Sequence, residues 1–437
     1  MKLPIGSAKL AWLGLLASLL ICAGVWRWAE VIVVPGNTLA ARSQQVPIGN
    51  NSDLYPRWFG ARELLLHHKD PYSAEVTRGI QRGFYGRELD PNNPTDPTDK
   101  VGFAYPLYVV FFLAPTVSFP FSAVQAFAKW FMLAAIAASV PLWMYAMGFR
   151  SKLPWVMAGM VLAIGSYPAV LEFHMQNLAA CVALLLAGAA GAAAANSLFL
   201  CGVLVAFSTI KPQMSGLFVL WFLAWTAARW RERKWVAIGF GATMLVLAGG
   251  AEILQPGWIR EFLAAIRAYG TYATDPSLVE FVFGPSFGQP IAIGLCCFLL
   301  VMIWRGRLSP NGSADFGWAL AWTATVTLAI IPVTVYNQVL LVPAFLILLL
   351  NWKHLSGVVP RGMAKGAVLC QVWQWGTATV IGIASLMIAP ERLRMVMRVP
   401  FLTLIALPAV MLLAIVTATL LARAGRLTPQ MSAARHG

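Results

Sequence analysis

Residues 10–30 read LAWLGLLASLLICAGVWRWAE, an apolar segment whose only charged side chains, Arg27 and Glu30, come at its end. A helix needs about 20 mostly apolar residues to cross the hydrocarbon core of a bilayer. The segment is long for the apolar part of a signal peptide, and no A-x-A cleavage site follows it. We therefore expect an uncleaved first membrane span.

The composition of the whole chain also indicates a membrane protein. Hydrophobic residues make up 59% of the 437 residues and charged residues 11%, whereas a soluble domain carries about 25% charged residues. The formal net charge of +15 would suit nucleic acid, but the basic residues fall between apolar runs, where they set the orientation of a membrane protein. We therefore expect no nucleic-acid partner. All six cysteines lie inside apolar runs, so we expect neither disulfides nor a CxxC metal site.

Repeated apolar runs predict an all-α integral membrane protein with about twelve transmembrane helices, in which residues 1–437 form a single polytopic domain. The expected spans lie near residues 10–30, 130–148, 154–171, 178–195, 197–210, 213–228, 235–252, 288–304, 315–331, 338–351, 366–388 and 400–422. Residues 103–122 are also apolar, but they hold three prolines and end in SFPF. We expect this segment to lie in the membrane interface; the alternative is that it crosses.

The distribution of lysine and arginine orients these spans. With the N-terminus inside, most of these residues beyond the first loop fall in interior segments, as the positive-inside rule requires. We therefore expect cytoplasmic termini and a location in the inner or plasma membrane. The loop APERLRMVMRVP, residues 389–400, breaks the pattern. Two exterior loops are large, residues 31–129 and 253–287, and we expect both to carry interfacial helices.

The first exterior loop contains NNSDLYPRWFGARELLLHHKDPYS, residues 50–73. Residues 54–68 can form one helix, with Asp53 placed to be its N-cap. An interfacial amphipathic helix with its arginines on lipid headgroups explains this stretch without any site, and Asp70 is explained by an Asp-Pro turn. A functional interpretation requires polar residues from other parts of the chain on the same side of the membrane as Asp53.

Three apolar runs end in abrupt polar clusters: LEFHMQN at 171–177, STIKPQ at 208–213 and PVTVYNQ at 332–338. Ionisable groups near the membrane core are costly and are functional candidates by default. Each cluster also has a structural explanation, because Lys211 can snorkel to the interface, His174 can be a core histidine and the amides can join helices. The expected topology places all three clusters on the side of Asp53, which favours a shared site.

The order of these motifs resembles the GT-C glycosyltransferases, above all the branch of polyprenol-phosphate-mannose-dependent α-mannosyltransferases. Asp53 with YPRWFGARELLLHHKDPYS, followed by FAYPLYVVFFLAPTVSFPF, is similar to their first loop. HMQN resembles their G-Q-x-N element, and GVLVAFSTIKPQ resembles the element that ends in I-K-P. The resemblance covers roughly residues 50–235. The chain departs from the pattern at VYNQ (335–338), where relatives often carry a histidine, and at HHK (67–69), where a small residue is usual.

The resemblance implies a hexosyltransferase that moves a sugar, with mannose the commonest case, from a polyprenyl-phosphate donor at the exterior membrane face. The acceptor is a hydroxyl of a glycolipid, a glycan or a protein. Phosphate leaves as a stable anion, so positive charge helps more than a strong acid does. The candidates for holding it are Lys211, Arg57, Arg62, His67 and His68.

Asp53 is the candidate general base, and a single base predicts inversion of the anomeric carbon. The candidates for substrate binding are Tyr105, His174, Gln176, Asn177, Tyr336, Asn337 and Gln338. Membrane lipids are the other expected partners. We expect no cofactor, and no metal, because the acids of DPNNPTDPTDK (90–100) are scattered along a proline-rich loop.

Two other classes of membrane protein remain as alternatives. A lipid or solute transporter, including a flippase, usually shows mid-span ionisable residues and an internal repeat, and the sequence shows neither clearly. An enzyme of the O-antigen ligase type usually concentrates its function in a large late exterior loop, whereas the longest exterior loop here is the first. A structural or assembly role is a third alternative.

Overall fold

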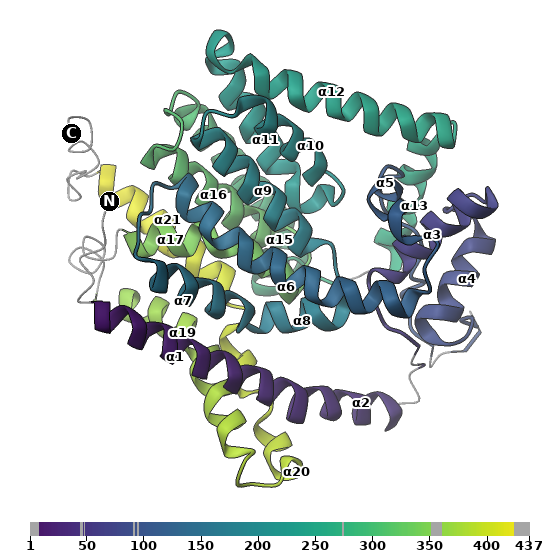
Figure 1. The fold of residues 1–437 in the computed structure, drawn as a ribbon, viewed down its shortest axis with the longest axis horizontal. Helices are drawn as coiled ribbons and strands as arrows, with labels where there is room; N and C mark the ends of the chain where they lie inside the picture. The colour runs from purple at the N-terminus through teal and green to yellow at the C-terminus, as the bar shows by residue number, and fades with distance from the viewer. Residues whose placement is uncertain are drawn as a thin grey trace.

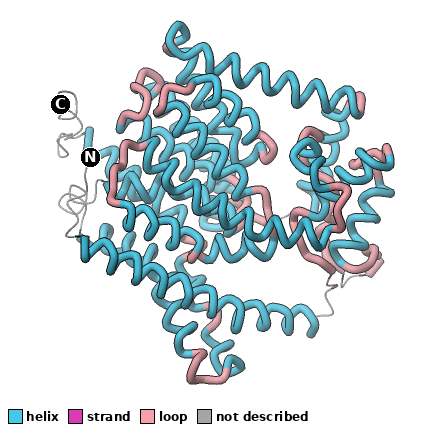
Figure 2. Tube along the Cα trace, in the orientation of Figure 1, coloured by secondary structure: helices cyan, strands magenta, loops and turns pink. Residues whose placement is uncertain are grey.

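The computed structural model describes residues 8–43, 47, 49–90, 92–93, 96–272, 275–350 and 361–423 of the chain. These residues form helices and connecting loops, with an isolated β-bridge between Ser277 and Pro332 and no β-strand (Figure 1, Figure 2). Five helical segments are long and apolar enough to cross a membrane, or six if one bent helix pair forms a span. The expectation of an all-α membrane protein is confirmed, and about twelve spans stays a prediction.

The helices follow the apolar runs of the sequence. In the first half they are α1 Ala8–Trp28, the π-helical turn η1 Ala29–Val33, α2 Val34–Ser43, α3 Tyr55–His67, α4 Ala74–Tyr85, α5 Val109–Leu113, the 3-10 turn η2 Ala114–Thr116, α6 Phe121–Ala146, α7 Leu153–Ile164, α8 Tyr167–Met175, α9 Ala179–Ala194, α10 Leu198–Ser208 and α11 Pro212–Ala228.

In the second half they are α12 Trp230–Leu254, α13 Trp258–Tyr272, α14 Leu278–Phe283, α15 Pro285–Gly306, α16 Ala314–Ile330, the 3-10 turn η3 Val335–Leu341, α17 Val342–Leu350, α19 Arg361–Ala384, α20 Pro390–Leu393, the 3-10 turns η4 Arg394–Val396 and η5 Val399–Thr403, and α21 Leu407–Arg423. The loop 253–287 does contain a helix, α13, and its expected place at the membrane interface stays a prediction.

Two boundaries differ from the prediction. The span expected near 130–148 begins earlier, at Phe121. Pro120 directly precedes the helix and limits its extension toward the N-terminus, because proline lacks the backbone N–H that a position inside a helix needs. The span expected at 154–171 is broken into α7 and α8, which are bent by 58°. The break falls at Gly165, where a Cβ would meet the Cα of Cys22 at 2.8 Å, so only glycine allows α1 to approach this closely.

The core is built around helices that are apolar on every side. All but a few side chains of α16 are buried, and Thr323 satisfies its hydroxyl within the helix by donating to the Ala319 carbonyl at 2.8 Å. Helix α9 consists largely of alanine and glycine and packs against α6 and α10. Helices in a membrane gain little from the hydrophobic effect when they associate, because lipid is as apolar as their side chains. Small side chains instead let the helix backbones approach closely and pack well.

The first large loop folds as a separate group of helices at one end of the molecule. Helices α3, α4 and α5 lie there together with α13 (Figure 1). Helix α3 buries Trp58, Ala61 and Leu64, and the Trp58 indole donates to the Thr116 carbonyl at 3.2 Å. This packing fixes the start of α3, where Asp53 lies, against the ends of the bundle helices.

Helix α19 runs beside α1 in the same direction. The Thr379 hydroxyl donates to the Ile21 carbonyl at 3.3 Å, and the Arg27 guanidinium donates to the Ser385 carbonyl at 3.1 Å. The two backbones meet at glycines, since a Cβ on Gly24 would lie 2.9 Å from the Thr379 Cα and a Cβ on Gly382 would strike the Gly24 carbonyl oxygen.

Substitution of Gly382 by leucine tests this contact. Because the obstructing atoms are α1 backbone, we expect Gly382→Leu to destabilise the fold by about 1–3 kcal/mol, as overpacking typically does. Gly376→Leu is the matched control on the same helix, because a Cβ there meets nothing within 4 Å. Thermal unfolding in detergent measures both, and equal melting temperatures for the two variants would contradict the close contact.

Candidate active site

Asp53 does not cap the helix that follows it. The prediction of an N-cap is wrong, because the N-cap of α3 is Leu54 and no side chain makes the capping hydrogen bond. The Asp53 carboxylate turns instead toward α8, where its Oδ2 accepts a hydrogen bond from Asn177 Nδ2 at 2.7 Å. The Asp53 backbone N–H donates to the Met175 carbonyl at 2.7 Å. Two contacts therefore tie the start of α3 to the end of α8.

Asn177 is placed by an unusual turn at the end of α8. The preceding residue, Gln176, has a left-handed backbone with φ of 48°, and its side-chain carbonyl accepts from Gln125 Nε2 at 3.0 Å. The turn brings the Asn177 amide between Asp53 and Lys211, and its Oδ1 accepts from Lys211 Nζ at 2.7 Å. One amide thus links an acid and a base that are far apart in the sequence.

Lys211 lies in the turn between α10 and α11 and is only 2% exposed. Its ammonium group also donates to Asn337 Oδ1 at 2.7 Å and lies 4.9 Å from the centroid of the Tyr336 ring. A lysine carries three N–H donors, and two of them are used by amide oxygens while an aromatic face lies nearby. The three polar clusters of the sequence therefore meet at this side chain.

The charge of Lys211 depends on pH near neutrality. Burial lowers its pKa to about 7, although the Glu172 and Asp53 carboxylates act to raise it and Arg57 acts to lower it further. An anion placed beside the ammonium would raise the pKa again. Binding of an anionic substrate and protonation of this lysine are therefore coupled.

Arg57 lies one helical turn beyond Asp53 and donates to the Asp53 backbone carbonyl. Its guanidinium lies 4.1 Å from the centroid of the Tyr105 ring. Burial alone would lower the pKa of Arg57, but Tyr105, Asp53 and Tyr336 together hold it above its ordinary value. Arg57 is partly exposed, whereas Lys211 is buried.

Glu172 is a member of the cluster that the sequence prediction passed over. Its side chain is 0% exposed, Oε1 accepts from the Ala180 N–H at 3.2 Å, and Oε2 has no hydrogen-bond partner. Its carboxyl group interacts electrostatically with both Lys211 and Asp53. Its position in LEFHMQN, five residues before Asn177, is the signal in the sequence that could have identified it.

Three candidates for phosphate binding lie away from this cluster. Arg62 donates to the Val117 carbonyl at 3.0 Å. His67 lies 3.8 Å from Glu63 and is about half exposed, and His68 is the exposed left-handed C-cap of α3. The 13 residues of α3 separate both histidines from Asp53 by about 20 Å along the helix axis. The structure does not bring these side chains together with Asp53.

Two candidates for substrate binding also make other contacts. His174 Nε2 lies 2.9 Å from Glu30 Oε1 and joins α8 to η1. Gln338 donates to the Leu404 carbonyl at 2.7 Å. Tyr105, Gln176, Asn177, Tyr336 and Asn337 are the predicted binding residues that the structure places around Asp53 and Lys211.

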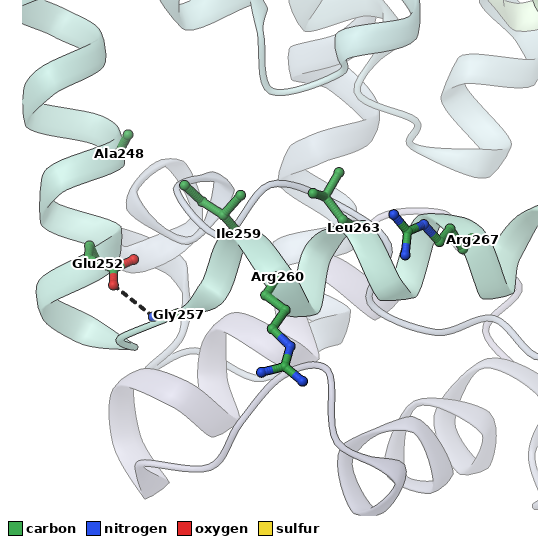
Figure 3. A pocket seen from close by; sticks show the side chains of 7 residues that line it. All are labelled: Ala248, Glu252, Gly257, Ile259, Arg260, Leu263 and Arg267. Carbon is green, nitrogen blue, oxygen red and sulfur yellow. Dashed lines mark hydrogen bonds between the residues drawn. The ribbon is translucent and has the colours of Figure 1, made fainter.

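An open groove lies between the end of α12 and α13, with a volume of about 600 Å³. Its apolar wall contains Ala248, Ile259 and Leu263, and its charged side chains are Glu252, Arg260 and Arg267. In Figure 3, Ile259 and Leu263 project to one side of α13 and Arg260 projects to the other. Glu252 is engaged at the turn, where it accepts from the Gly257 N–H at 2.8 Å.

Helix α13 connects this groove to the Lys211 turn. The Trp258 ring lies 5.7 Å from the ring of Tyr108, and the Tyr108 hydroxyl donates to Thr209 Oγ1 at 2.9 Å. Thr209 is two residues before Lys211. At the other end of α13, Tyr269 and Tyr272 lie within the electrostatic reach of Arg57. Helix α13, which forms one side of the groove, therefore also contacts the segment that leads to Lys211.

The described part of the chain contains no group of three or more His, Cys, Asp and Glu side chains suited to a metal ion. The expectation of a metal-free site stays a prediction. Comparison of the chain with protein-family models, curated proteins and solved structures finds no match.

The arrangement suits transfer of a proton next to a developing anion. Asp53 is partly exposed, its Oδ2 is held by Asn177, and no described residue donates to its Oδ1. One carboxylate oxygen is thus oriented while the other can accept a proton. Arg57 supplies positive charge beside it, and a guanidinium binds phosphate through two parallel N–H donors.

The lowered pKa of Lys211 predicts how stability changes with pH. The folded lysine holds fewer protons than the unfolded one between pH of about 7 and 10, so raising the pH stabilises the fold. As the pH rises through this window, the free energy of unfolding of the wild type should increase relative to that of Lys211→Met by up to about 1.4 kcal/mol per pH unit. Thermal unfolding from pH 6 to 9.5 measures it, with Lys100→Met as an exposed control. A difference that stays constant with pH would contradict the shift.

Proposed function

We propose that the protein is a membrane glycosyltransferase that moves a sugar from a polyprenyl-phosphate donor to a hydroxyl acceptor, with Asp53 as the general base. The observation that carries this proposal is the linkage of Asp53 to Lys211 through Asn177, with Arg57 beside them. These four side chains come from three separate segments of the chain. The resemblance of their motifs to the GT-C glycosyltransferases points in the same direction.

The proposed reaction breaks the bond between C1 of the sugar and the phosphate oxygen. The acceptor hydroxyl gives its proton to Asp53 Oδ1 as its oxygen attacks C1, and the lipid phosphate leaves with the bonding electrons. Arg57 stabilises the developing phosphate charge, because preorganised cations act most strongly where charge develops. Attack from the face opposite the phosphate inverts the anomeric carbon.

Lys211 has a different role in this proposal from that of Arg57. It is buried, and two of its three N–H donors already bind amide oxygens, so it is less accessible to a phosphate than Arg57 is. Its charge instead orients the Asn177 amide toward Asp53 and adds positive potential to the site. Mannose is the sugar that the resemblance favours, and the acceptor is a glycolipid, a glycan or a protein at the exterior membrane face.

The groove at α13 is suited to the polyprenyl chain of the donor. Its apolar wall can cover a hydrocarbon chain, and Arg260 and Arg267 add positive charge for a phosphate-bearing lipid. Its attachment to the Lys211 turn through Trp258 and Tyr108 would keep the chain close to the charged cluster.

Substitution of Asp53 by asparagine tests the base directly. Asparagine keeps an oxygen that can accept from Asn177 but cannot take up the acceptor proton, so we expect transfer to fall by about 10²–10⁴-fold. The measurement uses a radiolabelled polyprenyl-phosphate sugar and membranes as the acceptor source. Asp90→Asn, an exposed acid of the same loop, is the control and should keep full activity.

The same assay separates the enzyme from its alternatives. Undiminished transfer by both Asp53→Asn and Asp53→Ala would remove the base assignment. If the wild type transfers no sugar but moves lipid or solute across vesicles without an acceptor, the protein is a transporter and the proposed function is wrong.

Leu263→Asp tests the groove. A charge in the apolar wall should raise KM about tenfold or more for a long-chain donor, since each buried CH₂ contributes about 0.8 kcal/mol. The kcat and the KM for a donor with two isoprene units should stay unchanged. Ile266→Asp is the control, because Ile266 lies on the same helix without lining the groove. An equal rise of KM for both donors would contradict chain binding here.

A further inference from the structure

The segment between α19 and α21 is not used by the proposed site. Residues 386–403, named the arginine hairpin below, contain α20, η4 and η5. In Figure 1, α20 projects beyond α1 at the bottom of the view, away from the helical bundle. The hairpin includes the loop APERLRMVMRVP, whose basic residues conflict with the positive-inside rule.

The hairpin lies beside the half of the first helical segment that leads toward Asp53. This segment, Ala8–Ser43, is 36 residues long, or about 54 Å at helical rise, whereas the hydrocarbon core is about 30 Å thick. The hairpin packs on its second half, because Phe401 lies 5.3 Å from Trp28 and a Cβ on Gly36 would meet the Met397 sulfur at 2.8 Å. Asp53 follows the same end of this segment, so the hairpin and Asp53 share one side.

The outer surface of the hairpin is strongly apolar. Met387 is 91% exposed and Met395 is 88% exposed, and the side chains of Leu386 and Leu402 are also exposed. Leu393 is buried and holds the hairpin to the rest of the molecule. Two largely exposed methionines are unfavourable in water but suit the region between lipid headgroups and acyl chains, where flexible apolar side chains can insert.

The charged side chains of the hairpin are mainly arginines. Arg392 and Arg398 are exposed, and neither forms an ion pair with any described residue. Arg394 lies 3.6 Å from Glu391, the single acid of this segment. The hairpin therefore presents two uncompensated guanidinium groups next to an apolar tip, and guanidinium is the side chain best matched to phosphate.

We propose that the arginine hairpin binds anionic phospholipids in the leaflet on the Asp53 side of the membrane. Met387 and Met395 insert among the acyl chains, while Arg392 and Arg398 bind lipid phosphates. A second copy of the chain fits this surface poorly, because a symmetric contact would place like arginines against one another. A zwitterionic lipid fits less well, since its ammonium group offsets the phosphate charge.

The test uses the purified full-length protein in nanodiscs of phosphatidylcholine alone and of phosphatidylcholine with 30% phosphatidylglycerol. A ligand that binds only the folded state raises the melting temperature. We expect phosphatidylglycerol to raise that of the wild type by several degrees, and this shift to be lost in the double variant Arg392→Gln, Arg398→Gln. Arg150→Gln, Arg231→Gln removes the same charge from exposed positions elsewhere and should keep the shift.

Native mass spectrometry of the same samples gives a second measurement, which does not depend on thermal unfolding. The wild type should retain several-fold more phosphatidylglycerol than phosphatidylcholine, and the hairpin variant should lose this preference. Equal shifts in the wild type and the hairpin variant would overturn the proposal. So would a stable wild-type dimer that dissociates in the hairpin variant, because a second copy would then cover this surface.

Discussion

The amide of Asn177 makes two hydrogen bonds on which the candidate site depends. Its Nδ2 donates to the Asp53 carboxylate and its Oδ1 accepts from the Lys211 ammonium, each at 2.7 Å. Only a side chain with both a donor and an acceptor at its tip can join an acid to a base in this way. The Asp53 carboxylate therefore bonds to a neutral amide, and the Lys211 ammonium bonds to the other end of the same amide.

The surrounding fold serves to position this amide. The break between α7 and α8 frees α8 to end at the left-handed Gln176, so that the next residue points toward α3. The buried Glu172 holds the following turn through the Ala180 N–H. A buried lysine and a buried carboxylate each have a high desolvation cost, and their mutual attraction offsets part of it. The free-energy cost of burying these two groups is consistent with a site that is retained for chemistry rather than for stability.

The sequence predicted the membrane class, most helix positions and the residues that meet at Lys211, because long apolar runs and sudden polar clusters are strong local signals. It failed where tertiary contacts decide the outcome. Asp53 has the sequence position of an N-cap, but its carboxylate accepts a hydrogen bond from the Asn177 amide instead. His67 and His68 follow Asp53 closely in the sequence, yet a straight helix carries them away from it. Glu172 was overlooked because its burial depends on helices that are distant in the chain.

The most direct test of the account is an electron cryomicroscopy map of the protein with a non-hydrolysable polyprenyl-phosphonate sugar. The account predicts the phosphonate against Arg57 and C1 of the sugar facing Asp53, with Asp53, Asn177 and Lys211 still joined by hydrogen bonds. The acceptor hydroxyl position should then lie within about 2.6–3.2 Å of the Asp53 carboxylate. Density for the analogue elsewhere, with the Asp53 carboxylate facing lipid or bulk water, would contradict the account.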